Sequence, residues 1–547
     1  TSEDPQVLVG VIEAGEYVQD MPQINIPGMA GSGVMNKRID WCFTSVPQAT
    51  ANGRVIDQPR GKVLGGSSAL NLLVAGRASA EEYDALEALG NPGWNWNGLL
   101  KYFKKSETLH YPPADLATKY EIGWHPHFHG SDGPLQLTYP RYVWDLHKPW
   151  AQTLDRLGIP NNPEPSGGNN AGSTFIAGCV DPVSATRSYS TTAYYEPNQQ
   201  RKNLVVLPQA QATRVLFDST ASPVVATGVE YFANGSKYTA HASQEVVLSA
   251  GSLQTPQLLE LSGIGDATLL KKFGIHTVVD LPAVGENLPS TFETTDEWAT
   301  SDLFRDPALR AKEMDLYVTK KEGRFSSAHS AYAFLPLRTF CDPKTVQSMK
   351  AEIANDPFYT TTSGLRKQIE YLTTWFDNPA HPQIEMIQNP QMRPGAGVAE
   401  PGKKYQTLMA CNMHPLSRGS VHIQSRDPLS QPAIDPGYLR NPLDLAVLVL
   451  AVRFARQLTA AAPLSSTIVR ECAPGADAQT DEQIAEFVKN TLSPVYHPVG
   501  SASMLPREDG GVVDPRLVVY GTKNLRIVDA SILPLVECFT CFESSEG

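Results

Sequence analysis

The sequence predicts an α/β fold, and three segments carry that prediction. Residues 7–12 form a short apolar, β-branched run that is typical of a buried parallel strand, and this run ends at Glu13. A second strand-like run over 245–251 ends in small residues and leads into an apolar helical segment. Between them, residues 59–71 hold two adjacent glycines and then two serines, as in a loop that enters a helix and meets an anion. Plain sheet core and an ordinary glycine turn with a serine cap remain the alternatives.

Length and charge limit the number of domains and the classes of partner that the chain can have. The chain has 547 residues, which predicts two large domains or three to four smaller ones. With 41% hydrophobic and 19% charged residues it can bury a sizeable core, and the net charge of −12 argues against a dedicated nucleic-acid binder. The longest purely apolar run, residues 445–452, is far shorter than the roughly 20 residues of a membrane span. We therefore expect no nucleic-acid partner and no transmembrane segment.

The first strand has the features of a dinucleotide-binding unit. An acid at the tip of such a strand binds the ribose hydroxyls, and the glycine fingerprint lies about 20 residues upstream of it. Counting back from Glu13 passes the first residue, and the near-matches at 263–265 and 395–397 lack the third glycine. We therefore expect the first strand and the glycine turn to be missing, which leaves exposed strand edges.

Several later elements follow from local patterns. Residues 204–216 and 228–232 are predicted as strands, and Asn234-Gly235 is the expected hairpin turn. Pro256 is expected near the first position of a helix. Apolar residues at helical spacing predict two further helices, over 443–457 and 481–492, with Thr480 and Asp481 as caps of the second. Residues 290–410 carry less pattern.

Two long motifs carry a family resemblance. They are Gly61-Lys-Val-Leu-Gly-Gly-Ser-Ser-Ala-Leu-Asn71 and Gly251-Ser-Leu-Gln-Thr-Pro-Gln-Leu-Leu-Glu-Leu-Ser-Gly-Ile-Gly265. With them the chain resembles the glucose–methanol–choline (GMC) flavoprotein oxidoreductases, most nearly the fungal alcohol oxidase and dehydrogenase type. Shorter matches extend the resemblance over nearly the whole chain, at residues 40–41, 92–96, 129–134, 284–288, 414–419, 497–500 and 524–531.

The resemblance implies a Rossmann-type FAD-binding domain and a substrate domain with an antiparallel sheet. The FAD domain would be discontinuous, over 1–85, 184–289 and 495–547, and the substrate domain would take 86–183 and 290–494. The family oxidises a small-molecule alcohol to a carbonyl by hydride transfer to the flavin, and oxygen or another acceptor then takes the electrons. Some members bind FAD covalently through a histidine just before the asparagine of the first motif. Leu70 stands in that place, so we predict a noncovalent FAD.

The same resemblance assigns the site residues. His497 falls on the active-site histidine, which would take the hydroxyl proton as the hydride leaves. Thr540 stands where the family has a second catalytic histidine or asparagine, and it could offer only a hydroxyl hydrogen bond. Glu13 would hold the adenosine ribose, and Ala212 would lie at the adenine. The residues expected at the pyrophosphate, flavin and ribityl chain are Gly65, Gly66, Ser67, Ser68, Asn71, Asp529 and Ala530.

Two other functions stay open at this point. A lyase or cyclase that keeps FAD only as a scaffold is one, because Thr540 replaces the second catalytic residue. An inactive fragment is the other, because the last twelve residues do not resemble the family and both ends look truncated. The resemblance leaves apolar and aromatic alcohols, polyols and choline as possible substrates, and it does not address the oligomeric state.

Three minor features have ordinary interpretations. His125, His127 and His129 alternate, but Pro126 and a glycine-rich turn interrupt them, so we predict no metal site there. The pair Cys538 and Cys541 has no second pair to complete a zinc site. The single glycosylation sequon at Asn234, together with the fungal resemblance, slightly favours secretion over a cytoplasmic location.

Overall fold

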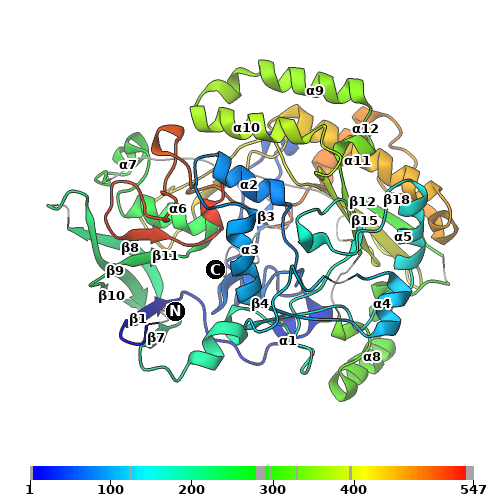
Figure 1. The fold of residues 1–547 in the computed structure, drawn as a ribbon, viewed down its shortest axis with the longest axis horizontal. Helices are drawn as coiled ribbons and strands as arrows, with labels where there is room; N and C mark the ends of the chain where they lie inside the picture. The colour runs from blue at the N-terminus through cyan, green and yellow to red at the C-terminus, as the bar shows by residue number, and fades with distance from the viewer. Residues whose placement is uncertain are drawn as a thin grey trace.

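A computed structural model describes residues 4–123, 125–218, 220–278, 290–295, 297–327, 331–393 and 397–536 of the chain. Figure 1 shows short sheets on one side of the molecule and a larger sheet on the other side, with helices packed around the larger sheet. The fold is therefore the predicted α/β arrangement with a separate antiparallel sheet.

Parallel pairing joins distant parts of the chain in the first region. Strand β1 (Val9–Ile12) pairs with β7 (Leu204–Leu207), and β11 (Val246–Leu248) pairs with β19 (Leu525–Ile527). The predicted strands at 7–12 and 245–251 are thus confirmed, each as a shorter segment. Because these pairs combine the start, the middle and the end of the chain, this region is discontinuous in sequence.

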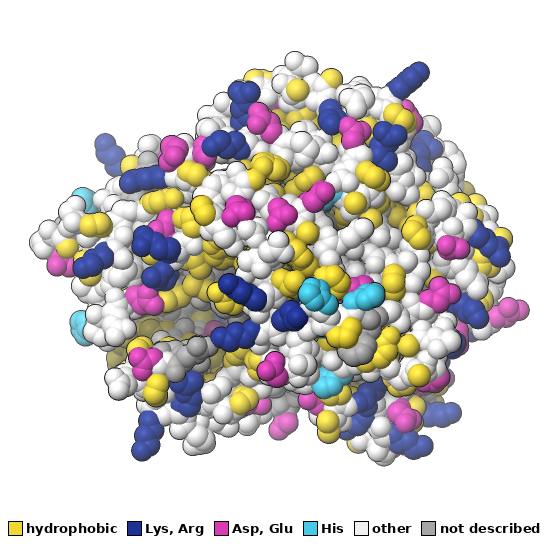
Figure 2. Space-filling view, viewed as in Figure 1, with side chains coloured by type: hydrophobic (Ala, Val, Ile, Leu, Met, Phe, Trp, Pro, Cys, Tyr) yellow, Lys and Arg dark blue, Asp and Glu magenta, His cyan; other side chains and the backbone are white. Residues whose placement is uncertain are grey.

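Each of the two parallel pairs has an open edge. Among the described residues, no strand pairs with the second edge of β1 or of β11. Apolar side chains are also exposed on these segments: Leu8, just before β1, is 70% exposed, and Val247 in β11 is 47% exposed. Figure 2 shows the surface hollowed on this side of the molecule, with hydrophobic side chains in the hollow.

A three-stranded antiparallel sheet lies beside them. It contains β8 (Gln211–Asp218), β9 (Val225–Ala233) and β10 (Ser236–His241). Asn234 and Gly235 join the last two strands with φ values of 49° and 75°. Positive φ at both central residues is what a tight hairpin turn requires, so the predicted turn is confirmed.

The six-stranded sheet has the order β18-β12-β15-β14-β13-β6, and every neighbouring pair is antiparallel. Its strands are β6 (Gly172–Phe175), β12 (Ser290–Thr294), β13 (Ala331–Leu335), β14 (Ile384–Asn389), β15 (Lys404–Asn412) and β18 (Ile468–Ala473). This is the antiparallel sheet expected for the substrate domain.

Side chains alternate between the two faces of this sheet. One face packs into the main hydrophobic core beneath the helices, with Ala333, Met386 and Ala410 among its members. The opposite face carries a separate cluster of apolar side chains, which we call the Tyr332 face; it comprises Ile176, Tyr332, Phe334, Ile387, Met409, Cys411 and Met413. The sheet thus buries side chains on both faces, one in the main core and one in this separate cluster.

Most helices begin at a recognisable cap. The side chains of Asp306, Asp342, Thr362, Asn441 and Thr480 each accept a backbone N–H at a helix start. The helices of eight residues or more are α2 (Ala80–Ala88), α3 (Trp96–Ser106), α5 (His147–Arg156), α6 (Gly251–Leu261), α8 (Pro307–Lys320), α9 (Pro343–Asn355), α10 (Ser363–Trp375), α11 (Pro442–Ala460) and α12 (Asp481–Thr491). The last two confirm the helices predicted from periodicity. No helix in the described ranges combines the length and hydropathy that a membrane crossing needs.

The remaining elements are short. They are α1 (Pro22–Asn25), α4 (Ala114–Tyr120), α7 (Ala267–Lys272), β2 (Phe43–Thr44), β3 (Asp57–Gln58), β4 (Glu107–His110), β5 (Leu135–Thr138), β16 (Ser420–His422) and β17 (Ala433–Asp435).

The position of Pro256 corrects one prediction. It was expected at the first turn of its helix, but α6 begins at Gly251 and Pro256 lies inside it. Proline has no N–H, so the carbonyl four residues earlier, that of Ser252, loses its helical donor. The hydroxyl of Ser501 donates to this carbonyl at 2.7 Å, which explains how the helix accommodates the proline.

Candidate active site

His497 lies on the segment that follows α12 and is partly buried. Its neighbour Tyr496 has a φ of 71°, an uncommon conformation for a residue with a side chain. Burial, and then the positive charge of Arg60, lower the pKa of His497 to about 4. The imidazole is therefore neutral near pH 7 and has a lone pair that can accept a proton.

Contacts of the residues just before His497 hold this segment against the Tyr332 face. Val495, two residues before His497, packs on that face. The Arg393 guanidinium donates to Ser493 Oγ at 3.2 Å and contacts Met409 Sδ at 2.7 Å. The approach to His497 is thereby tied to the sheet that forms the other region of the molecule.

The glycine-rich loop makes a single turn of 3₁₀-helix over Gly66–Ala69. Of the two interpretations of this segment, the glycine turn therefore fits better than a loop that enters a longer helix, because the helical turn ends at Ala69. A Cβ at Gly65 would lie 2.6 Å from Thr191 Oγ1 and 2.9 Å from the ring of Tyr189, so only glycine fits there. Gly66 has a φ of 53°, and a Cβ there would meet nothing within 4 Å. The loop thus packs on the protein at Gly65 and leaves open space at Gly66.

The two serines of the loop bond within the protein. Ser68 Oγ donates to the Gly65 carbonyl at 2.6 Å and lies 2.8 Å from Ser190 Oγ. Ser67 Oγ accepts the Gly61 N–H at 3.2 Å. These hydroxyls fix the shape of the loop, and contact with a cofactor stays a prediction for both.

A buried arginine supports the loop from below. Arg187 donates to the carbonyls of Ile24 at 2.8 Å, Ser68 at 3.0 Å and Asn71 at 2.9 Å, and also to Asn71 Oδ1. These acceptors are neutral, and burial lowers the pKa of Arg187 to about 10, so the guanidinium keeps its charge. Sequence analysis missed this residue, because nothing near Arg187 in the chain distinguishes it from a surface arginine.

Glu13 lies beside a hollow on the surface. Its Oε1 accepts the Gly15 N–H at 2.6 Å, and burial raises its pKa to about 7 against the opposing effects of that bond and of Lys62. The hollow has about 330 Å³ of space. It is lined by Ala14, Gly15, Glu16, Lys37, Arg38, Lys62, Gln209, Gln211, Phe232, Ala233 and Asn234. Ala212 follows the lining residue Gln211 in β8.

The last strand is tied to α6 by a carboxylate. Asp529 Oδ2 accepts the Gly251 N–H at 2.9 Å and the Thr255 hydroxyl at 2.6 Å, while Oδ1 accepts the Ser531 N–H at 2.9 Å. Ala530, the next residue, is buried. The Asp529 side chain therefore positions the end of β19, and contact of this pair with a cofactor stays a prediction. Thr540, Cys538 and Cys541 lie outside the described residues.

These features together fit a dinucleotide cofactor. Gly66 and Gly251 both have positive φ, and in both cases the space that a side chain would fill is empty. Three basic side chains line the hollow next to Glu13, where an anionic pyrophosphate needs positive charge. A close approach of the backbone at glycines and a basic lining are what such a ligand requires.

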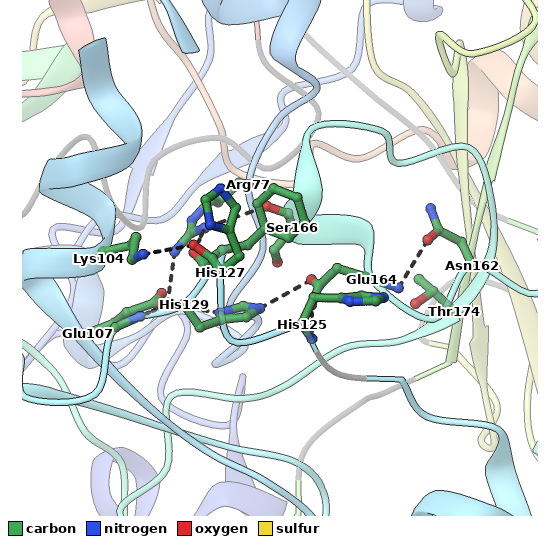
Figure 3. A network of polar contacts seen from close by, with 12 residues as sticks. Arg77, Lys104, Glu107, His125, His127, His129, Asn162, Glu164, Ser166 and Thr174 are labelled. Carbon is green, nitrogen blue, oxygen red and sulfur yellow. Dashed lines mark hydrogen bonds and ion pairs between the residues drawn. The ribbon is translucent and has the colours of Figure 1, made fainter. Parts of the chain in front are cut away.

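The alternating histidines belong to a different, structural network. Figure 3 shows His129 between two carboxylates: Nδ1 lies 2.9 Å from Glu107 and Nε2 lies 3.1 Å from Glu164. Arg77 pairs with Glu107 at 2.8 Å on its other side. His125 instead joins through its backbone N–H, which donates to Glu164 at 3.2 Å.

Several features make this network structural. Burial would lower the pKa of His129, but hydrogen bonds to Glu107 and Glu164 raise it to about 9. His127 takes part only through its carbonyl, which accepts Lys104 Nζ at 2.7 Å. The adjoining cavity has only about 10 Å³, about the room for one water molecule. The network thus joins buried charges and leaves no space for a substrate.

Comparison with known families gives matches over both ends of the chain. The N-terminal model described as GMC oxidoreductase matches residues 28–292, and the C-terminal model with the same description matches residues 415–541.

Known relatives match over nearly the full chain. A dehydrogenase of Armillaria gallica is 36% identical, over 98% of this chain and 86% of its own. Among solved structures, an FAD-dependent oxidoreductase from Chaetomium thermophilum has a TM-score of 0.90 at 29% identity, covering 100% of this chain and 94% of the other. A fungal aryl-alcohol oxidase has a TM-score of 0.84 at 27% identity, covering 99% and 92%.

Proposed function

The chain belongs to the GMC oxidoreductase family and uses FAD as its cofactor, and on that premise we propose that it oxidises an apolar, preferably aromatic, alcohol to the carbonyl compound. In this proposal FAD is bound noncovalently and His497 is the base. The FAD-binding domain is assigned to 1–85, 184–289 and 495–547, and the substrate domain to 86–183 and 290–494.

One observation carries the proposal. The Tyr332 face of the six-stranded sheet contacts Val74, which follows the glycine-rich loop, and Val495, which precedes His497. The segment after the predicted cofactor loop and the segment before the candidate base therefore both pack on this apolar face, which supports a site between them. An alcohol bound there would lie between the cofactor and an imidazole that can take its proton.

The chemistry divides between cofactor and protein. A bound FAD would supply the acceptor for the hydride that leaves the carbon carrying the hydroxyl. The neutral imidazole of His497 accepts the hydroxyl proton, so that the carbonyl forms as the hydride departs. Burial, and then the positive charge of Arg60, lower the pKa of His497 and so keep its imidazole unprotonated into the acid range.

The Tyr332 face indicates the class of alcohol. Its side chains are aromatic, aliphatic or sulfur-containing. Glu385 lies on the same face by strand alternation, and burial raises its pKa to about 8, so it is uncharged at neutral pH. An apolar or aromatic alcohol therefore suits this face better than a quaternary ammonium alcohol, which would gain from an ionised carboxylate. The likeness to an aryl-alcohol oxidase supports this choice.

The noncovalent mode rests on Leu70. This side chain is buried with Ile39, Val63 and Ala69 in a small apolar cluster below the loop. An aliphatic side chain offers no nucleophile for a bond to the flavin. Denaturation with acid should therefore release all of the FAD into the supernatant, and flavin that stays with the precipitated protein would contradict this part of the proposal.

The function is tested with a panel of alcohols and no oxygen. Benzyl-type alcohols, linear alkanols, glycerol and choline are added to the holoenzyme, and the flavin absorbance is followed. We expect bleaching with the benzyl-type alcohols first. Substrate turnover with unchanged flavin absorbance would instead favour the lyase or cyclase, and a purified chain without flavin would favour the inactive fragment.

A further inference from the structure

A second cluster of side chains with the chemistry of a metal site lies in the core, apart from the features used above. Glu82 comes from α2, His381 from the turn after α10, and His414 from the turn after β15. Figure 1 shows α2 and α10 next to each other at the top of the view. One potential ligand atom from each residue lies within 4.8 Å of the other two. We call these three residues the Glu82 cluster.

The geometry within the cluster is close to what one ion needs. His414 Nε2 lies 2.8 Å from Glu82 Oε1, and the two imidazole ring centres are 4.7 Å apart. Zinc binds nitrogen and carboxylate oxygen at about 2.0–2.2 Å, so its ligand atoms lie roughly 3 Å or slightly more from one another. Small shifts of side chains would therefore bring all three ligands to a common centre.

Neighbouring residues hold the three side chains in place. The ring of Trp375 stacks on His381 with centres 4.1 Å apart, and its edge meets His414 at 5.0 Å. The Ser79 N–H donates to Glu82 Oε2 at 2.6 Å, and Ser79 Oγ lies 3.4 Å from His381 Nδ1. Such outer contacts are the usual means of orienting metal ligands. Ser79 Oγ, or a water molecule, could supply a fourth ligand.

Burial sets this cluster apart from ordinary surface histidines and carboxylates. All three side chains are at most 2% exposed. His381 Nε2 has no hydrogen-bond partner among the described residues, although it is buried.

We propose that Glu82, His381 and His414 bind one Zn²⁺ ion, which joins α2 to the substrate domain. Two imidazoles and one carboxylate are a common ligand set for zinc, whereas calcium and magnesium prefer oxygen ligands alone. The ion would bind the Glu82 carboxylate together with both imidazoles and would give His381 Nε2 a ligand bond. Because its ligands come from three separate segments, its role would be to stabilise the packing of those segments.

The first test uses the wild-type holoenzyme. The protein is purified from cells grown with zinc, dialysed against metal-free buffer, and analysed by mass spectrometry for metals and by absorbance for FAD. We expect about one zinc ion per FAD. If the protein equilibrated with zinc retains none in stoichiometric amount, the proposal is overturned, and Glu82 and His414 form only a hydrogen-bonded buried pair.

Two further measurements on the wild type avoid reliance on variants. Removal of the ion with a chelator should lower the Tm, and added Zn²⁺ should restore it, because an ion that binds only the folded state stabilises it. Replacement by Co²⁺ should give the intense visible bands of a tetrahedral cobalt site at wavelengths beyond the flavin absorbance. A Tm that responds to neither chelator nor zinc, or cobalt bands typical of an octahedral hydrated ion, contradicts the proposal.

Variants then test whether the ion binds at the Glu82 cluster. His381→Gln and His414→Gln should each lose the metal while keeping the flavin spectrum. His422→Gln is the matched control, because His422 is a partly exposed histidine that pairs with Glu260 at 2.6 Å in another part of the fold. This control should keep the metal. If the two cluster variants bind as much zinc as the control, the ion is adventitious and the proposal fails.

Discussion

The hydroxyl of Ser501 donates a hydrogen bond to the carbonyl of Ser252, the carbonyl that Pro256 deprives of its helical donor. This bond spans a long stretch of sequence and connects α6 with the segment just after His497. The bond therefore fixes α6, which lies in the second family motif, against the segment that carries the candidate base His497. It can form because Pro256 leaves the Ser252 carbonyl without a helical donor.

The first prediction follows from this bond. Ser501→Ala leaves the Ser252 carbonyl buried without a donor, so the free energy of unfolding should fall by about 1–3 kcal/mol. In a Pro256→Ala background the helix supplies its own N–H, and the same Ser501→Ala change should then cost much less. Urea unfolding of the four proteins measures the difference. Equal costs of Ser501→Ala in both backgrounds would show that the two residues are not coupled.

The second prediction concerns the pH dependence of activity. Burial and Arg60 lower the pKa of His497 to about 4, so the imidazole stays neutral and active until the pH falls to that value. On the acid side of its pH profile, kcat/KM should therefore stay constant from neutral pH down to about 5 and fall below about 4. Arg60→Gln removes the repelling charge and should move this limb to higher pH. A limb that begins near the ordinary histidine pKa in the wild type would argue against His497 as the group that titrates.

The third prediction concerns stability at alkaline pH. His129 has a pKa raised from 6.5 to about 9 by Glu107 and Glu164, so its contribution is fully present below pH 6.5 and is lost as the pH rises through 9. The shift corresponds to roughly 3 kcal/mol at most. His129→Gln should be less stable at pH 6 and should lose less stability than the wild type between pH 7 and 10. Parallel stability curves for the two proteins would contradict the ion-pair assignment.

The fourth prediction concerns Arg187 beneath the glycine-rich loop. Arg187→Met strips donors from the carbonyls of Ile24, Ser68 and Asn71, so it should lower the free energy of unfolding by about 3 kcal/mol and weaken FAD retention. Arg187→Lys keeps the charge but not the forked arrangement of donors. Its stability and its FAD retention should therefore lie between those of the wild type and Arg187→Met. Flavin content after gel filtration, together with urea unfolding, measures both effects. If Arg187→Met keeps the wild-type affinity for FAD, then Arg187 does not support cofactor binding through the loop.

Local sequence patterns predicted the turn and the helices whose conformation depends on neighbouring residues in the chain. The Asn234-Gly235 turn follows from the positive φ that asparagine and glycine tolerate, and α11 and α12 follow from apolar residues at helical spacing. Two further helices carry clear start signals in the sequence. Asp306 precedes Pro307 and Asp342 precedes Pro343, which is the pattern of a capping side chain followed by proline at the first position.

Features that depend on long-range pairing could not be predicted from the sequence. The Tyr332 face exists only because β13, β14 and β15 pair in one register, which places Phe334 beside Glu385 and Glu385 beside Cys411. The acceptors of Arg187 and the partners of His381 come from equally distant parts of the chain. The family motifs located His497 and the glycine-rich loop, but the surface between them is a property of the folded sheet.

The most direct test of the central claim is the rate at which the flavin of the holoenzyme is reduced by a benzyl-type alcohol without oxygen. His497→Asn is compared with the wild type, and His422→Asn is the control. Loss of a general base commonly costs a factor of about 10²–10⁴. The account predicts rapid bleaching in the wild type and the control, and a loss of that size in His497→Asn with the flavin still bound. Bleaching at the wild-type rate in His497→Asn, or none in the wild type with any alcohol, would contradict it.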